Sequence, residues 1–170
     1  MTSDLSTVPT IAYRAEQPYL AVKGPVTMNT IPAIADRFPE VFGFLAAKGI
    51  EPAGAPFLKY NVIDMEQQLE MEAGVPVPAG MTGDGEVFAG VLPAGRYATV
   101  HHVGHPEALL RVTAGLLEWA AGQGLEWDMS ETSGADRWAC RMEEYHTDPA
   151  VEPDMNKWET DLAFKLADRP

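Results

Sequence analysis

The sequence predicts an α+β fold in which a duplicated β-α-β-β unit forms a pseudo-two-fold antiparallel sheet, with two main helices on one face. Three observations support this fold. The chain has 170 residues, 46% of them hydrophobic, which is enough to bury the core of one domain. Apolar residues alternate as in strands in several segments and follow helical spacing in two others. Similar segments also recur in the same order in the two halves of the chain.

The internal similarity is clearest in two stretches that begin Tyr-x-x-Val. "YLAVKGPVTM" starts at Tyr19 and "YATVHHVGHP" starts at Tyr97, and each leads into a helical pattern that ends with a glycine. A third match pairs "MEAGVP" with "MEEYHTDP". The offset falls from 78 (97 − 19) at the tyrosines to 71 (143 − 72) at Glu72 and Glu143. A slowly drifting offset is typical of a duplicated unit with small deletions, and two copies indicate pseudo-symmetry rather than a solenoid.

The first copy is expected to span about residues 13–80. Strands are predicted over residues 13–23, 57–64 and 67–73. Thr30 is a suitable N-cap for a helix that runs toward Gly49. Pro39 lies inside this helix, so a kink or two short helices are expected. The apolar stripe comprises Ile34, Phe38, Val41, Phe42 and Leu45.

The second copy is expected to span about residues 86–168, after a loop over residues 74–86 that is rich in Gly and Pro. Pro106 suits the first turn of its helix, and Gly122 and Gly124 are suitable stop signals. Strands are predicted over residues 87–92, 97–103, 135–146 and 160–166. The apolar stripe of the helix comprises Leu109, Val112, Leu116, Trp119 and Ala120.

The charge balance excludes one broad class of function. The 25 acidic and 12 basic residues give a formal net charge of −13, and no cluster of Lys and Arg is present, so a nucleic-acid partner is not expected. With the single cysteine Cys140, no internal disulfide can form, which fits a reducing compartment. The N-terminus lacks a signal-peptide pattern, and no apolar stretch is long enough to span a bilayer. We therefore expect a cytoplasmic protein with no membrane partner.

The segment "RMEEYHTDP" places two carboxylates in a predicted strand, although strands disfavour Glu. Side chains alternate between the faces of a strand, so Arg141, Glu143 and Tyr145 share one face and Met142 and Glu144 lie on the other. The residues alone do not decide which face is inward.

Taken together, these segments resemble the GyrI-like effector-binding domain, the ligand-sensing part of several drug-responsive bacterial transcription activators. The resemblance rests on "YATVHHVGHPEAL", "WAAGQGL", "MEEYHTDP" and "KWETDLAFKLAD", and it extends over a single domain from residue 13 to residue 168. It implies a ligand cleft between the two copies, with Glu143 facing the cleft and Tyr145 beside it. The regulators carry a helical DNA-binding segment before this domain. Here residues 1–12 form an N-terminal extension too short for one, so binding to DNA is not expected.

The function implied first is binding of small lipophilic, cationic aromatic compounds next to a glutamate. The second is hydrolysis of reactive cyclopropane-bearing natural products, with Glu143 as general base and Tyr145 as proton donor. The third is a gyrase-inhibitor-like interaction with a protein. The oligomeric state and the identity of the ligand stay open. The expected ligand-binding residues are Glu143, Tyr145, Arg141, Trp138, Tyr60, Phe57, Trp127 and His102.

Three groups of residues are candidates for reactive or metal sites. Residues two apart on a strand are about 6.5–7 Å apart at their bases, so Glu143 and Tyr145 are expected to grip a substrate at separate points rather than form a tight pair. Adjacent His101 and His102 point to opposite faces of a strand, and no second cluster completes a site with His105, so no metal and no cofactor are expected. Cys140 has no evident catalytic partner and is expected to be a small buried residue.

Overall fold

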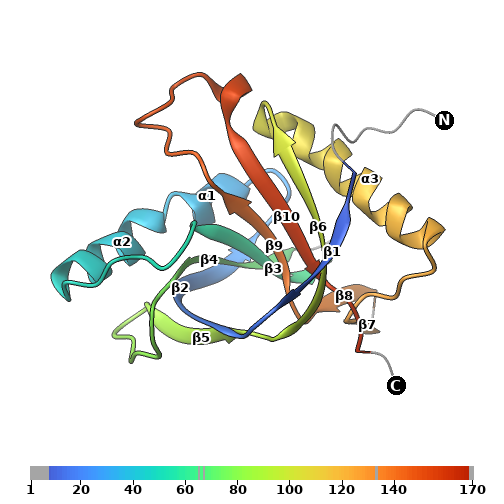
Figure 1. Ribbon diagram of the computed structural model, residues 1–170. Coiled ribbons are helices and arrows are strands. Elements are labelled where there is room, and N and C mark those ends of the chain that lie inside the picture. Colours follow the sequence, from blue (N-terminus) through green and yellow to red (C-terminus); the bar gives the residue numbers. More distant parts are fainter. Residues whose placement is uncertain (1–7, 65, 67, 133, 169–170) are drawn as a thin grey trace.

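The computed structural model describes residues 8–64, 66, 68–132 and 134–168 and shows one curled antiparallel sheet with helices packed on one face (Figure 1). This confirms the predicted α+β class, the antiparallel sheet and the two main helical regions. The strands are β1 (Thr10–Arg14), β2 (Gln17–Val26), β3 (Phe57–Ile63), β4 (Leu69–Pro76), β5 (Phe88–Leu92), β6 (Gly95–Val103), β7 (Met129–Thr132), β8 (Ala135–Trp138), β9 (Arg141–Tyr145) and β10 (Glu159–Lys165). The helices are α1 (Ile31–Ala35), α2 (Phe38–Ala47) and α3 (Leu109–Gly122), with short 3-10 turns at Pro106–Ala108 and Met155–Lys157.

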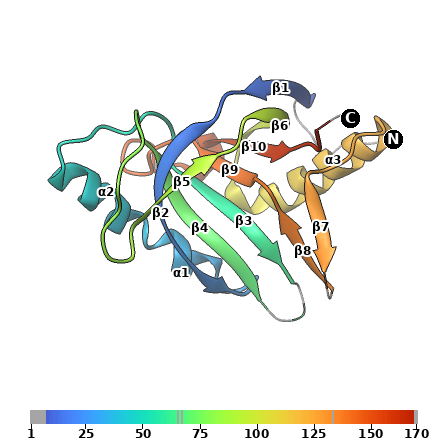
Figure 2. The ribbon, with the colours of Figure 1, turned by 90° about the horizontal axis from the view of Figure 1, so that it is seen from below.

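The order of strands explains the curl of the sheet. The hydrogen-bonded order is β1-β6-β10-β9-β3-β4-β2-β5, with β8 also pairing with β3 and β7 pairing with β8. β1 and β5 therefore lie at opposite edges. Only Ala15 and Glu16 separate β1 from β2, and only Pro93 and Ala94 separate β5 from β6. These short connections hold the two edges close together, so the sheet forms a half-barrel (Figure 2).

The two faces of the sheet have different neighbours. On the inner face of the half-barrel, residues of strands far apart in the sheet order pack into one cluster, among them Tyr19 of β2, Phe57 of β3 and Tyr97 of β6. The helices cover the outer face. Leu20, Leu58 and most other buried residues of β2, β3 and β4 pack there against α1 and α2, while α3 packs with β6 and β10.

The helices form where the apolar stripes predicted them. α3 buries Leu109, Val112, Leu116 and Ala120, which repeat at three- and four-residue spacing on one side of the helix. The predicted kink in the first helical region is a complete break between α1 and α2 at Asp36 and Arg37. Pro32 and Pro39 each occupy a first turn, where a proline costs no helical hydrogen bond.

Several predicted boundaries differ from the structure. The strand predicted over residues 13–23 is two strands, β1 and β2, and β1 begins at Thr10 within the predicted extension; residues 1–7 of that extension lie outside the described residues. The strand predicted over residues 135–146 is also two, because the chain bends at Ala139 and Cys140 between β8 and β9. β7 was not predicted.

The predicted loop over residues 74–86 begins too early, since β4 continues to Pro76. Gly74 lies in the strand, paired with Ala21 of β2 and Phe57 of β3. The Phe57 ring lies so close that a Cβ built at Gly74 would be 2.5 Å from it. A glycine that reads as a turn signal in the sequence therefore marks a close approach inside the sheet.

The third sequence match joins residues that are not equivalent in the fold. Glu72 lies on β4 with its side chain on the inner face, whereas Glu143 lies on β9 with its side chain on the outer face. The duplication stays a prediction, and this pair does not contribute to it.

Glu72 anchors a buried polar network on the inner face. It is 4% exposed, accepts hydrogen bonds from Tyr19 Oη at 2.6 Å and Asn61 Nδ2 at 2.6 Å, and lies 3.4 Å from Lys59 Nζ. If the carboxylate were removed, the Tyr19 hydroxyl and the Asn61 amide would lose their acceptor, and Lys59, which also donates to Asn61 Oδ1, would lose its counter-charge. The network therefore holds β2, β3 and β4 together within the half-barrel.

We expect Glu72→Ala to lower the free energy of unfolding by about 3–5 kcal/mol, because it leaves the buried Lys59 ammonium uncompensated. Glu70→Ala is the matched control on the same strand. Its carboxylate is 40% exposed and lies 3.9 Å from Lys23, so its loss should cost less than about 1 kcal/mol. Urea denaturation measures both values, and equal losses would contradict a structural role for the network.

Candidate functional site

A pocket of about 580 Å³ lies on the outer face of the sheet, over the central strands β3 and β9. Residues from both halves of the chain form its wall. The floor comes from strands in the middle of the sheet, one side comes from α3 and the turn before it, and the other comes from Met28 and Ile31 at the start of α1. The lining residues are Met28, Ile31, Leu58, Tyr60, Ile63, Leu69, Pro106, Glu107, Leu109, Leu110, Thr113, Ala114, Leu117, Arg141, Glu143, Tyr145 and Phe164.

Glu143 is the acidic group in the floor of this pocket. Its two carboxylate oxygens accept hydrogen bonds from Tyr145 Oη at 2.6 Å and from Tyr60 Oη at 3.2 Å. Burial raises the pKa of the Glu143 carboxyl above its usual value, and the two hydroxyl donors and the nearby Arg141 oppose that rise only in part. The carboxylate is therefore held in position by two donors but is costly to ionise.

The two tyrosines stay protonated and keep donating. Burial and the negative charge of Glu143 raise the pKa of both Tyr60 and Tyr145. Tyr145 is also held by an edge-on contact with Phe38 of α2, with ring centroids 6.4 Å apart. Both hydroxyls are thus fixed donors at the edge of the pocket.

Arg141 is the basic group in the same pocket. Its guanidinium carbon lies 4.6 Å from the ring centroid of Phe164, 4.8 Å from that of Trp138 and 5.6 Å from that of Tyr60. Burial lowers the pKa of the guanidinium. Its Nε atom is buried and has no hydrogen-bond partner among the described residues. The cation is therefore held by aromatic faces rather than by a carboxylate.

The structure brings together half of the residues expected in the site. Glu143, Tyr145, Arg141 and Tyr60 line the pocket. Glu144 lies on the opposite face of β9, away from the pocket, so the structure decides which of the two faces meets the site.

The other four expected residues do not line this pocket. Trp138 and Trp127 lie behind Arg141 and Phe164 in the core under α3, with their own ring centroids 5.5 Å apart. Phe57 is fully buried on the inner face. His102 is 8% exposed and points back to the carbonyl oxygen of His105, 3.4 Å from its Nε2 atom.

The α3 side of the pocket was missed by the sequence analysis. Leu110, Thr113, Ala114 and Leu117 contribute it, beside the stripe that packs on the sheet. Leu110 is 68% exposed. The signal in the sequence is that this helix carries apolar residues on two adjacent sides, more than one packing stripe needs.

Glu143 and Tyr145 are closer than the strand geometry suggested. Their bases are two residues apart, yet the long side chains converge until the hydroxyl and a carboxylate oxygen are 2.6 Å apart. The expectation that the two groups act from separate points is therefore wrong. They form one hydrogen-bonded unit.

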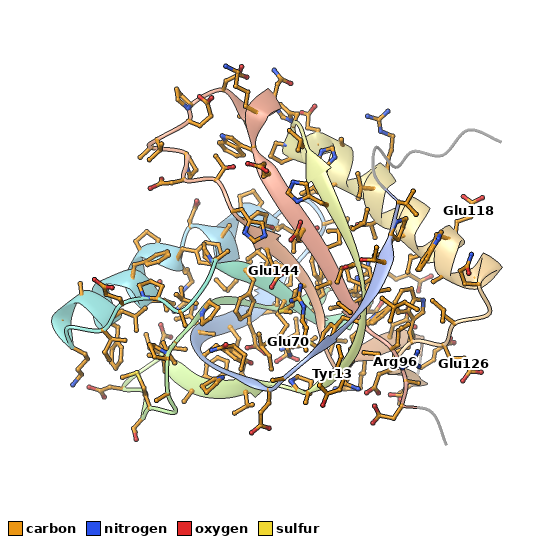
Figure 3. All side chains as sticks on the ribbon, viewed as in Figure 1. Tyr13, Glu70, Arg96, Glu118, Glu126 and Glu144 are labelled. Atoms are coloured by element: carbon orange, nitrogen blue, oxygen red, sulfur yellow. The ribbon has the colours of Figure 1, made fainter. Side chains whose placement is uncertain are left out.

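A second polar cluster lies on the inner face. Glu144 accepts two hydrogen bonds from Arg14, at 2.9 and 3.1 Å, and Figure 3 shows Glu144 near the centre of the molecule. Asp161 bridges His101 and His146. The ligand atoms of Glu144, His146 and Asp161 lie within 4.8 Å of one another, a spacing that a metal ion could use. Both carboxylate oxygens of Glu144, however, already accept hydrogen bonds from Arg14.

Cys140 lies among the buried residues of the inner face. Burial raises the pKa of its thiol to about 11, so the thiolate is scarce at neutral pH. This agrees with its expected role as a small buried residue.

Comparisons with known proteins place the fold. The family described as GyrI-like small molecule binding domain matches residues 7–167. No curated protein sequence matches the chain at a significant level. Within the part of the chain that the structure describes, every helix is too short or too polar to cross a membrane.

Four solved structures are similar over nearly all of the chain. The C-terminal domain of EcmrR has 17% identity and a TM-score of 0.68, covering 95% of this chain and 98% of that one. In EcmrR bound to DNA the TM-score is 0.75 with 16% identity, and the match covers 95% of this chain but 58% of the EcmrR chain. SAV2435 bound to tetraphenylphosphonium has 12% identity, a TM-score of 0.58 and coverage of 95% and 94%. A hydrolase from Listeria innocua has 14% identity, a TM-score of 0.58 and coverage of 94% and 91%.

The raised pKa of Glu143 makes stability depend on pH. Between the unfolded and folded pKa values the folded state binds more protons, so the free energy of unfolding falls as pH rises through that window. We expect Glu143→Gln to be more stable than the natural protein at pH 7, by about 0.5–2 kcal/mol, and to lose this advantage near pH 4.

Thermal unfolding at a series of pH values measures the difference. Glu144→Gln is the matched control, because it removes a carboxylate that Arg14 holds, and it should destabilise at pH 7. An unchanged pH slope in Glu143→Gln would show that Glu143 ionises as freely in the folded state as in the unfolded chain.

Proposed function

This chain belongs to the family of GyrI-like small molecule binding domains, and we propose that it binds lipophilic, cationic aromatic compounds in the pocket over β3 and β9. One observation carries the proposal. A carboxylate, Glu143, is fixed by two tyrosine hydroxyls in the floor of a pocket that is otherwise mostly apolar. Pockets of this kind, apolar with a few convergent polar groups, are typical of small-molecule sites.

The energetics favour a cation at this carboxylate. An ionised carboxylate in an apolar setting costs several kcal/mol unless it is paired. A delocalised organic cation would offset that cost without the large desolvation penalty of a compact ammonium. The rings of Tyr60 and Tyr145 can add roughly 0.5–2 kcal/mol each through cation–π contacts. The binding of tetraphenylphosphonium by SAV2435, which has a similar fold, supports this ligand class.

The position of the pocket supports a cleft between two related halves. In the sheet order, β6-β10-β9 is followed by β3-β4-β2, so the first strand of each half lies outside and the β9–β3 pair joins the halves. This mirrored order is what a duplicated β-α-β-β unit would produce. The pocket lies over the join, with α3 from one half and α1 from the other at its sides.

We expect Glu143→Gln to weaken the binding of 1-methylquinolinium by about tenfold or more, the value of one charge-assisted contact. The affinity for 1-methylnaphthalene should change little. The two ligands have the same shape and differ in charge. Isothermal titration calorimetry measures both affinities. The control Glu144→Gln removes the same charge from the inner face and should leave both unchanged. Equal losses of affinity for both ligands in Glu143→Gln would contradict a role for the Glu143 charge in binding.

A hydrolase is the second candidate, because the Tyr145 hydroxyl and the Glu143 carboxylate form one hydrogen-bonded unit. In this reaction Glu143 would take a proton from a water that attacks a strained ring carbon. The ring bond would break toward its activated end, and Tyr145 would give a proton to the departing atom. The raised pKa of Glu143 suits a base near neutral pH. The hydrolase from Listeria innocua has a similar fold.

Turnover separates the two candidates. If the protein is a hydrolase, a cyclopropane-bearing electrophile should gain one water, Glu143→Gln should abolish the reaction, and Tyr145→Phe should slow it by about 10²–10⁴-fold. Mass spectrometry of the product measures each rate against buffer. If the hydrated product forms no faster than in buffer, the hydrolase candidate is excluded and binding is the remaining function. The gyrase-inhibitor-like interaction stays a prediction from the resemblance.

A further inference from the structure

We infer that the preferred ligand is amphoteric: besides the cationic part that faces Glu143, it carries a carboxylate or similar anionic acceptor that binds Arg141. This inference rests on the proposed binding function of the same pocket. It goes beyond that proposal because it assigns a second polar anchor and the ligand chemistry that fits it.

Arg141 differs from Arg14 and Arg37, which are each paired with carboxylates. Arg14 is held by both oxygens of Glu144, and Arg37 is held by Glu40 and Glu86. Arg141 carries five N–H donors, yet among the residues that the structure describes no carboxylate lies within ion-pair distance and none accepts a hydrogen bond from it. A partly desolvated guanidinium left in this state is unfavourable, and an acceptor arriving in the pocket would relieve it.

Glu143 does not serve as that acceptor. Its oxygens accept hydrogen bonds from the hydroxyls of Tyr145 and Tyr60, and among the described residues no ion pair or hydrogen bond joins it to Arg141. Tyr60 also lies under the guanidinium, with 5.6 Å between the Arg141 carbon and the ring centroid. The same tyrosine thus contacts the anion through its hydroxyl and the cation through its ring, and the two charged groups attract each other without forming an ion pair.

The guanidinium is also preorganised for planar recognition. Contacts with Phe164 at 4.6 Å and Trp138 at 4.8 Å fix it against two further aromatic rings. A guanidinium that is already immobilised loses less entropy when it binds a carboxylate, and its fork geometry suits two parallel hydrogen bonds. Arg141 is therefore built to bind an acceptor rather than simply to fill space.

The two anchors lie close together in the pocket. Arg141 and Glu143 are two residues apart on the same face of β9, too far apart for an ion pair but close enough for each charge to affect the pKa of the other group. A purely cationic ligand at Glu143 would also meet the positive charge of Arg141, and this repulsion would weaken it. An aromatic compound that carries both a cationic and an anionic group would satisfy both anchors.

Rhodamine 19 and rhodamine 6G test the inference, because they share one cationic chromophore and differ by a carboxylate in the first and its ethyl ester in the second. We expect the natural protein to bind rhodamine 19 at least about tenfold more tightly. Arg141→Met keeps an apolar side chain and should remove this preference by weakening rhodamine 19, while rhodamine 6G stays equal or binds more tightly. Arg141→Lys, which keeps the charge but not the fork, should retain part of it.

Arg111→Met is the matched control, since Arg111 is an exposed arginine on α3 outside the pocket lining. It removes the same net charge and should leave the preference unchanged. Fluorescence anisotropy measures the affinity of each dye. The comparison of the two dyes on the natural protein needs no variant.

The outcomes are distinct. Equal binding of the two dyes, tighter binding of rhodamine 6G, or an equal change for both in Arg141→Met would overturn the inference and leave the proposed binding function in place. Binding of neither dye would overturn the proposed function, and the inference with it.

Discussion

The pairing of β9 with β3 is the contact on which the rest of this structure depends. It joins the two halves of the sheet, and its antiparallel register sets Leu58 opposite Glu143. That register puts Tyr60, two residues further along β3, within reach of the Glu143 carboxylate. A shift by one residue would turn Glu143 to the inner face and Glu144 to the pocket, because side chains alternate along a strand.

Buried charged groups have different partners on the two faces of the sheet. On the inner face, Glu72 has three polar partners within 3.4 Å and Glu144 is held by Arg14, so these charges contribute to a rigid scaffold. On the outer face, Glu143 is held by neutral donors and Arg141 by aromatic rings. Charges that are held in place without an ion pair cost stability in the free protein, and the proposed ligand would offset that cost.

The curl of the sheet explains why one domain carries both arrangements. The inner face is closed by the short β1–β2 and β5–β6 connections, which leave little room between its strands. On the outer face, α1 and α2 pack on the strands of one half of the sheet and α3 packs on those of the other. The surface over β9 and β3 is therefore left as a hollow lined by side chains from α3, the α1 region and the strands.

The sequence by itself determined the fold class, the helical stripes and the set of residues on each face of β9, because local spacing decides which way a side chain points. It also indicated Glu143 and Tyr145, through the resemblance. Only the tertiary structure decided that Phe57 lies on the far face and that the sides of α3 complete the pocket. It alone showed that Tyr60 contacts both Glu143 and Arg141 and that aromatic rings, not an ion-paired carboxylate, surround Arg141. These facts depend on which strands lie side by side and how far the sheet curls, and both follow from contacts between residues far apart in the chain, which no local pattern records.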